Sequence, residues 1–130
     1  MKISTKGRYG LLIMLDVASG YKEDKFISLK EISEKENISL KYLEKIMLNF
    51  KNSDFFISSR GGTGGYKLKY APKEYKIGDI LRIAEGDLNV TDCVHGGCTK
   101  AHACKTFSLW RDLNKTISDF LDSKTLEDYM

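Results

Sequence analysis

Apolar residues recur at helical spacing in three segments of the N-terminal part of the chain, which predicts three amphipathic helices. The first covers residues 4–19, and the second covers residues 28–36. The second opens with Ser28 and Glu31 at the spacing of a capping box, whose side chains satisfy free backbone N–H groups. Only two residues separate it from Ser39, which caps the third helix, so the pair forms a helix-turn-helix. The apolar stripe of the third helix consists of Leu43, Ile46, Met47 and Phe50.

The segments that come directly after the third helix have the pattern of β-strands. Residues 55–60 and 66–70 are predicted as strands, and the glycine-rich residues 61–65 connect them as a hairpin. A hairpin placed immediately after a helix-turn-helix is the wing of a winged helix. We therefore expect residues 1–72 to form a winged helix-turn-helix domain that binds DNA.

The rest of the chain predicts two more helices around a segment without periodicity. A short helix is expected over residues 77–86, and residues 87–105 show no regular period. A long helix over residues 106–121 has a wide apolar stripe of Trp110, Leu113, Ile117, Phe120 and Leu121. Two arrangements would bury such a stripe: packing against the rest of the same chain, or packing against a second copy of the chain in a two-fold dimer. We expect a homodimer with a mainly α fold and a small β-wing, in which residues 73–130 hold the aperiodic loop and a long C-terminal dimerisation helix.

Charge is distributed unevenly along the 130 residues. Residues 1–70 hold 13 Lys and Arg against 8 Asp and Glu, whereas residues 71–130 hold 8 against 10. A basic N-terminal half fits a region that binds a polyanion. The apolar run near the N-terminus is too short for a signal peptide, because Asp16 ends it. With 30% charged residues and no apolar segment of membrane-spanning length, we expect a cytoplasmic protein without membrane contact.

The expected winged helix directs polar side chains toward double-stranded DNA. If the apolar stripe of the third helix faces inward, Lys41 and Lys45 lie opposite and reach phosphates or guanine in the major groove. Arg60 precedes the glycine-rich tip, where it suits a narrow minor groove. The predicted DNA-binding set is Ser39, Lys41, Tyr42, Glu44, Lys45, Arg60, Gly61 and Lys67. A nucleotide phosphate loop is rejected, because that motif needs Gly-Lys-Ser/Thr leading into a helix, and here a strand follows.

All three cysteines and both histidines fall within residues 93–104. The set is Cys93, His95, Cys98, His102 and Cys104. Such a tract is typical of a metal site, and thiolates suit zinc and iron–sulfur clusters. A structural disulfide is disfavoured in the cytoplasm, and the lack of Cys-x-x-Cys argues against a thioredoxin-like enzyme.

Four segments resemble those of the IscR, NsrR and CymR regulators, which form the Rrf2 family. They are MKISTKGRYG at residues 1–10, ISLKYLE at 38–44, RGGTGGY at 60–66 and LWRDL at 109–113. The resemblance implies a dimeric winged-helix repressor or activator and no enzyme. It also implies that the loop within residues 73–130 binds an iron–sulfur cluster ahead of the dimer helix, with the ligands Cys93, Cys98 and Cys104. On the same basis, the recognition helix meets DNA through Ser39, Lys41, Tyr42 and Glu44, and Arg60 enters the minor groove.

The cysteine region departs from the family pattern in spacing and in its fourth ligand. Four residues separate Cys93 from Cys98, where IscR-type members have five. Phe107 stands at the position of their histidine ligand, and Arg8 stands at the position of the acidic ligand of NsrR-type members. The cluster can therefore be 2Fe–2S or 4Fe–4S, with a loop histidine as candidate fourth ligand, His102 or His95. Two alternatives stay open: a CymR-type regulator of cysteine metabolism with unmetallated thiols, and a zinc-stabilised interaction module.

Overall fold

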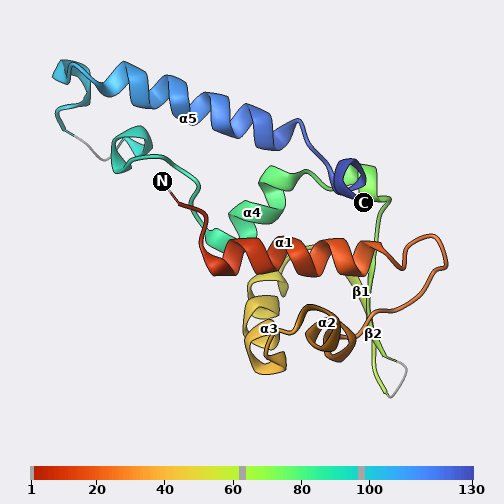
Figure 1. Cartoon of the computed structure of the whole chain (residues 1–130). Coiled ribbons are helices and arrows are strands. Elements are labelled where there is room, and N and C mark those ends of the chain that lie inside the picture. Colours follow the sequence, from red (N-terminus) through yellow and green to blue (C-terminus); the bar gives the residue numbers. More distant parts are fainter. Residues whose placement is uncertain (1, 62–63, 97–98) are drawn as a thin grey trace.

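The computed structural model describes residues 2–61, 64–96 and 99–130, which form a mainly α fold with one small sheet (Figure 1). Its helices and strands are α1 (Thr5–Ala18), α2 (Leu29–Glu36), α3 (Leu40–Met47), β1 (Phe56–Ser59), β2 (Gly65–Leu68), α4 (Ile77–Glu85) and α5 (Phe107–Asp122). Short 3-10 helices lie between and after them: η1 (Leu48–Phe50), η2 (Pro72–Glu74), η3 (Asp92–His95), η4 (Ala101–Ala103) and η5 (Leu126–Tyr129). This order of elements confirms the predicted winged helix-turn-helix followed by a long C-terminal helix. Among these residues, none of the helices has the length and apolar character needed to cross a membrane.

Serine side chains set the first residues of the three N-terminal helices. Ser4, Ser28 and Ser39 precede α1, α2 and α3, and each hydroxyl accepts a hydrogen bond from the backbone N–H three residues later. α2 ends at Asn37, which adopts the left-handed conformation with φ 55°. The chain therefore passes from α2 into α3 within a short turn, as the sequence predicts.

One hydrophobic core joins the N-terminal helices to α4 and the C-terminal segment. Its most deeply buried side chains include Ile13, Met14, Val17, Ile32, Leu43, Ile46, Ile80 and Leu126. The apolar stripe predicted for the third helix is buried throughout. Residues on both sides of position 72 contribute to this one core. The boundary at residue 72 between a DNA-binding and a cluster-binding region therefore stays a prediction about function.

The wing consists of β1 and β2, which pair antiparallel with Ser59 opposite Gly65. Ile27 pairs with β2 as an isolated bridge, because its N–H and C=O groups both bond to Tyr66 at 2.8 Å. Gly65 has φ 151°, and a Cβ there would lie 2.5 Å from the carbonyl group of Ile27. Glycine is therefore required where the wing meets the segment before α2.

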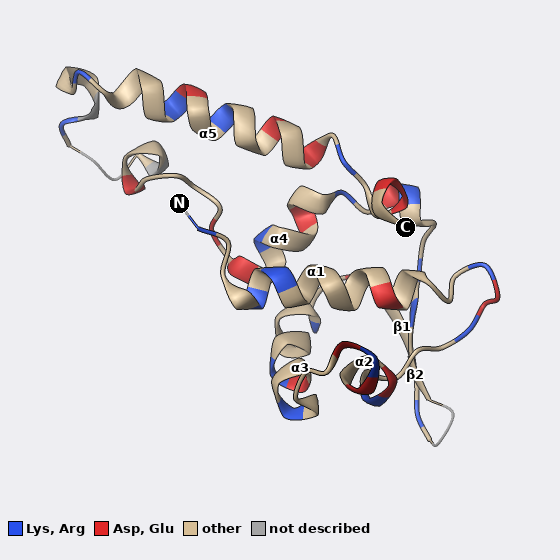
Figure 2. Cartoon of the chain, viewed as in Figure 1, with Lys and Arg blue, Asp and Glu red and all other residues tan. Residues whose placement is uncertain are grey.

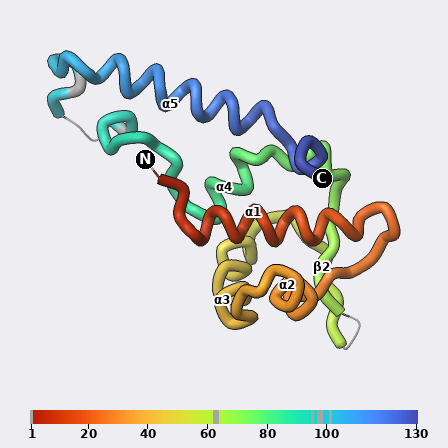
Figure 3. Tube along the Cα trace, viewed as in Figure 1, coloured from red at the N-terminus to blue at the C-terminus, as the bar shows by residue number. Residues whose placement is uncertain are grey.

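α5 lies on the opposite side of α1 from α2, α3 and the wing (Figure 1). None of the residues of α5 is buried. After α5 the chain turns back toward α1 (Figure 3). There η5 packs against α1 and η2, and Leu126 is completely buried. Thr125 also forms a bridge to Lys76, just before α4. The sequence did not predict η5, because four residues are too few to show a period.

An ion pair fastens the end of α5 to α4. Arg82 donates two hydrogen bonds to the Asp122 carboxylate, at 2.8 and 3.0 Å. Gly78 leaves room for this carboxylate, since a Cβ there would lie 2.0 Å from the Asp122 Oδ1. The hydrogen bonds from Arg82 lower the pKa of Asp122 below its usual value.

We predict that Asp122→Asn lowers the free energy of unfolding by about 1 kcal/mol at neutral pH, a small effect because solvent screens the pair. The two side chains are 36% and 37% exposed. Because the pKa of Asp122 is depressed on folding, the contribution is complete above the ordinary aspartate pKa of about 3.9 and is lost as pH falls through the lower folded value. Urea unfolding at fixed protein concentration across pH measures this difference. Asp119→Asn, which breaks an exposed pair with Lys115, is the control and should change the free energy of unfolding less. Equal stability of Asp122→Asn and the parent protein at pH 7 would refute the prediction.

Candidate functional site

α3 presents one face to the core and another to solvent. Leu43, Ile46 and Met47 are buried. The exposed residues of the helix include Lys41, Tyr42, Glu44 and Lys45. Figure 2 shows basic and acidic positions together on α3, on the same side of α1 as the wing. The helix thus has a free polar face, as a recognition helix requires.

Two of the predicted α3 contacts also hold the helix in place. The Ser39 hydroxyl accepts a hydrogen bond from the Tyr42 N–H at 3.3 Å. The Tyr42 ring meets the Tyr9 ring of α1 edge-on, with 5.9 Å between the centroids. Beside Tyr42, Lys6 of α1 and Lys45 of α3 line a hollow of about 150 Å³. The sequence analysis missed Lys6 as part of this face, because only the packing of α1 against α3 brings it there.

The wing places Arg60 and Gly61 beyond the end of β1, where both are exposed. Gly61 has φ 99°, in the left-handed region that favours glycine, and nothing lies within 4 Å of the position a Cβ would take. Lys67 is placed differently, because its Nζ pairs with Asp24 at 2.6 Å and lies 4.7 Å from the centre of the Phe26 ring. Its side chain is only 19% exposed. Lys67 already has an anionic partner within the chain, and its contact with DNA stays a prediction.

The cysteine loop lies between α4 and α5. Cys93 is half-buried in η3, Cys104 is exposed shortly before α5, and both are free thiols. His102 is exposed in η4. Cys98 lies outside the described residues, and so does the side chain of His95. Among the described residues, no three His, Cys, Asp or Glu side chains are grouped to hold a metal ion.

The surroundings of Cys104 favour its thiolate form. Its sulfur shares a hydrogen bond with the Thr106 hydroxyl at 3.4 Å. That bond, together with bonds from the backbone N–H groups of Thr106 and Phe107, lowers the pKa of the Cys104 thiol. A thiolate is the form that binds iron or zinc. The chemistry of this donor therefore fits a zinc ion or an iron–sulfur cluster.

Asn114 fastens the loop before Cys93 to α5. Its side-chain oxygen accepts a hydrogen bond from the Val90 N–H at 2.9 Å, and its amide donates to the Asn89 side chain at 2.9 Å. η3 also packs against α5. The segment before Cys93 is therefore attached directly to α5.

Comparison with known families identifies the chain. The profile of the Rrf2 family, described as an iron-dependent transcriptional regulator, matches residues 3–130. The chain belongs to the Rrf2 family. The resemblance drawn from its sequence is thereby confirmed.

Relatives of this Rrf2 protein are transcriptional regulators. The HTH-type transcriptional regulator IscR of Aliivibrio salmonicida is 39% identical over 132 residues, which cover all of this chain and 77% of that protein. Among solved structures, CymR, the global cysteine regulator of B. subtilis, has a TM-score of 0.82 at 38% identity and covers 99% of this chain and 95% of CymR. For T. potens IscR the TM-score is 0.78 at 36% identity, with coverage of 99% and 85%. The chain is accordingly a transcriptional regulator with a fold similar to both IscR and CymR.

Proposed function

We propose that this Rrf2 regulator acts in the cytoplasm as a homodimer on double-stranded DNA, and that an iron–sulfur cluster sets its DNA affinity. The cluster ligands are Cys93, Cys98 and Cys104. The observation that carries the proposal is the pairing of a free polar face on α3 with a thiolate-favouring Cys104 just ahead of α5. The first supplies a surface for DNA, and the second supplies a metal ligand attached to the helix that would join two subunits.

The DNA contacts follow from the exposed face of α3 and from the wing. Lys41 and Lys45 reach phosphates or guanine, and Glu44 accepts a hydrogen bond from cytosine. The Ser39 hydroxyl and the N-terminal N–H groups of α3 bind phosphate. Arg60 enters an adjacent minor groove, whose narrow form attracts arginine. Tyr42, Gly61 and Lys67 complete the proposed interface, with Lys67 available once its pair with Asp24 opens.

Replacing Arg60 with alanine tests the wing contact. We expect Arg60→Ala to weaken binding by about 1–3 kcal/mol and to relax the preference for A·T-rich minor groove. Parent binding should fall steeply with salt, because released phosphate counterions drive it. Fluorescence anisotropy on a series of duplexes at several salt concentrations measures both effects. Lys115→Ala is the matched control, because Lys115 belongs to α5, which lies on the opposite side of α1 from the wing (Figure 2). Unchanged binding by Arg60→Ala across all duplexes would remove the wing from the interface.

A second copy of the chain would cover the apolar side of α5. Leu109, Leu113 and Phe120 are 57%, 40% and 56% exposed, an arrangement that is unfavourable in water. An apolar hollow of about 450 Å³ between α1, α4 and the end of α5 continues this surface. A two-fold dimer through α5 would present two recognition helices about 34 Å apart, one turn of the duplex.

The cluster would control DNA binding through the connection between the loop and α5. When bound, the cluster supplies sensitivity to iron supply, oxidation or nitric oxide. Its gain, loss or oxidation would shift residues 87–105, and Asn114 would pass the shift to α5. A changed dimer geometry alters the spacing of the recognition helices and hence the affinity for a palindrome.

Two other functions have specific support. The first is a regulator of cysteine metabolism, supported by the likeness to CymR, the global cysteine regulator of B. subtilis; its thiols would hold no metal. The thiolate-favouring setting of Cys104 suits zinc as well as iron, which would make the loop a zinc-stabilised interaction module. Anaerobic purification followed by iron, sulfide and zinc analysis separates the three. Our proposal requires iron and acid-labile sulfide in each subunit, the second function requires neither metal, and the third requires zinc alone.

A further inference from the structure

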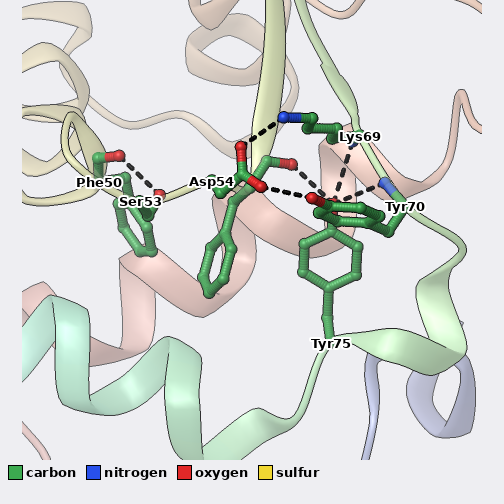
Figure 4. Close-up of polar contacts among 7 residues, drawn as sticks. Phe50, Ser53, Asp54, Lys69, Tyr70 and Tyr75 are labelled. Carbon is green, nitrogen blue, oxygen red and sulfur yellow. Dashed lines mark hydrogen bonds and ion pairs between the residues drawn. The ribbon is translucent and has the colours of Figure 1, made fainter.

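The hydroxyl group of Tyr75 closes the base of the wing (Figure 4). It accepts hydrogen bonds from the backbone N–H groups of Lys69 and Tyr70, both at 3.0 Å. It donates a third, at 2.7 Å, to the backbone carbonyl of Phe55. Phe55 and Lys69 flank the last residue pair of the β1–β2 ladder, so the phenol joins both strands of the hairpin where they leave the body of the protein.

Tyr75 is itself held firmly. The residue lies between η2 and α4, it is 3% exposed, and its ring packs edge-on against Phe55 with 5.2 Å between the centroids. Its backbone carbonyl accepts a hydrogen bond from the Leu126 N–H at 3.1 Å, which ties it to η5. Burial raises the pKa of the Tyr75 phenol, so the group stays protonated and able to donate at neutral pH. The hydroxyl is thus a fixed point provided by the core.

Hydrogen bonds to the backbone of the hairpin attach it to the rest of the protein at two places, and the Lys67–Asp24 pair and the buried Leu68 side chain also hold it. The bridge from Ile27 holds Tyr66 in the middle of the ladder, and Tyr75 holds its base. An isolated two-stranded hairpin is marginally stable, so it depends on such attachments. Arg60 lies about 15 Å along the hairpin from the base, and a tilt of about 4° there would displace it by about 1 Å. Losing the Tyr75 hydroxyl would remove the attachment at the base and leave the hairpin freer to tilt about the Ile27 bridge and the Lys67–Asp24 pair.

We propose that Tyr75 is a positioning residue for DNA binding, whose hydroxyl fixes the direction of the wing and so the place of Arg60 in the minor groove. This inference rests on the proposed function, because it requires Arg60 to contact DNA. Asp54 joins the side chains of the same two residues, accepting from the Lys69 Nζ at 2.6 Å and from the Tyr70 hydroxyl. That link is on the surface and open to water, so it adds little to the direction of the hairpin.

A double-mutant cycle between Tyr75→Phe and Arg60→Ala tests the inference. Tyr75→Phe keeps the ring in the core and removes only the hydroxyl. On a duplex selected by the parent protein from a random-sequence pool, we expect Tyr75→Phe to weaken binding about fivefold and to reduce the preference for A·T pairs at the wing. In the Arg60→Ala background the same substitution should change affinity by less than about twofold. Tyr70→Phe, which removes only the exposed bond to Asp54, is the matched control and should bind as the parent does.

The possible outcomes separate this inference from the proposed function. Parental affinity of Tyr75→Phe, or an equal loss in both backgrounds, would overturn the positioning role while leaving the Arg60 contact intact. If Arg60→Ala alone binds as the parent does, the proposed wing contact fails and the inference fails with it. Amide exchange gives a second readout on the DNA-free protein. Exchange in Tyr75→Phe should rise over residues 56–60 and match the parent in α1 and α3; parental exchange in the hairpin would also overturn the proposal.

Discussion

Charged residues at Leu113 and Ile117 should convert the protein from a dimer to a monomer and weaken its binding to palindromic DNA by about a hundredfold or more, because the two half-sites are no longer bound by linked recognition helices. Both residues belong to the apolar stripe of α5, on which no residue is buried within one chain. A charge in the centre of a covered apolar interface lacks a partner and is strongly unfavourable. Sedimentation at the concentrations used for binding measures the oligomeric state, and anisotropy on the palindrome and on a half-site measures the loss.

The control for this experiment is a charge on the polar side of the same helix. Lys115 is exposed and pairs with Asp119 one turn later. Lys115→Glu should therefore remain dimeric and bind the palindrome nearly as the parent does. A parent protein that sediments as a monomer yet binds palindromes tightly would contradict the proposed dimer.

Cys104→Ala should leave the purified protein colourless and free of iron. Three thiolates are the minimum set proposed here, and the Thr106 hydroxyl and N–H groups at the start of α5 lower the pKa of Cys104. Removing it leaves two cysteines, too few for a stable cluster. Thr106→Val is the matched variant, because it keeps the thiol and removes only the side-chain hydrogen bond at 3.4 Å. The Thr106→Val variant should still load a cluster. A coloured Cys104→Ala protein would rule out Cys104 as a ligand.

The same set of cluster-loading experiments tests which residue is the fourth ligand of the cluster. We expect His102→Ala to form a cluster of altered spectrum and shorter lifetime in air, since imidazole ligation tunes both. His95→Ala is the paired test, because these are the only two histidines of the chain. If both variants match the parent while Cys104→Ala stays colourless, histidine ligation is wrong. The three-cysteine site would then be completed by water, a small thiol or Asp92.

The helix starts and the wing could be predicted from the sequence, because they depend on residues close together in the chain. Ser28 and Ser39 cap α2 and α3 as their spacing predicts. The hairpin forms in the predicted place, although its strands are shorter at three of their four ends, at Phe56, Ser59 and Leu68. The fold class was accessible for the same reason, since the order of these local elements defines a winged helix.

Pairings between distant residues could not be predicted. In the sequence Asp16 marks only the end of an apolar run, yet it is 6% exposed and binds Lys35 of α2 at 2.8 Å. Leu126 is completely buried by η2 and α1, far away in the sequence. The candidate site likewise could be predicted only where it depends on local sequence. The free face of α3 follows from its period, whereas the pairing of Lys67 with Asp24 depends on how the wing packs beside the turn after α1.

The central claim is that a cluster on the cysteine loop sets the affinity for DNA. Its most direct test is the affinity of one anaerobic preparation for its selected duplex, measured before and after the metal is removed by chelation. We predict that the iron-loaded and metal-free forms differ by about tenfold or more, the range of an allosteric coupling, and that Cys104→Ala binds as the metal-free parent does. Equal affinity of the loaded and metal-free forms for every duplex tested would contradict the claim.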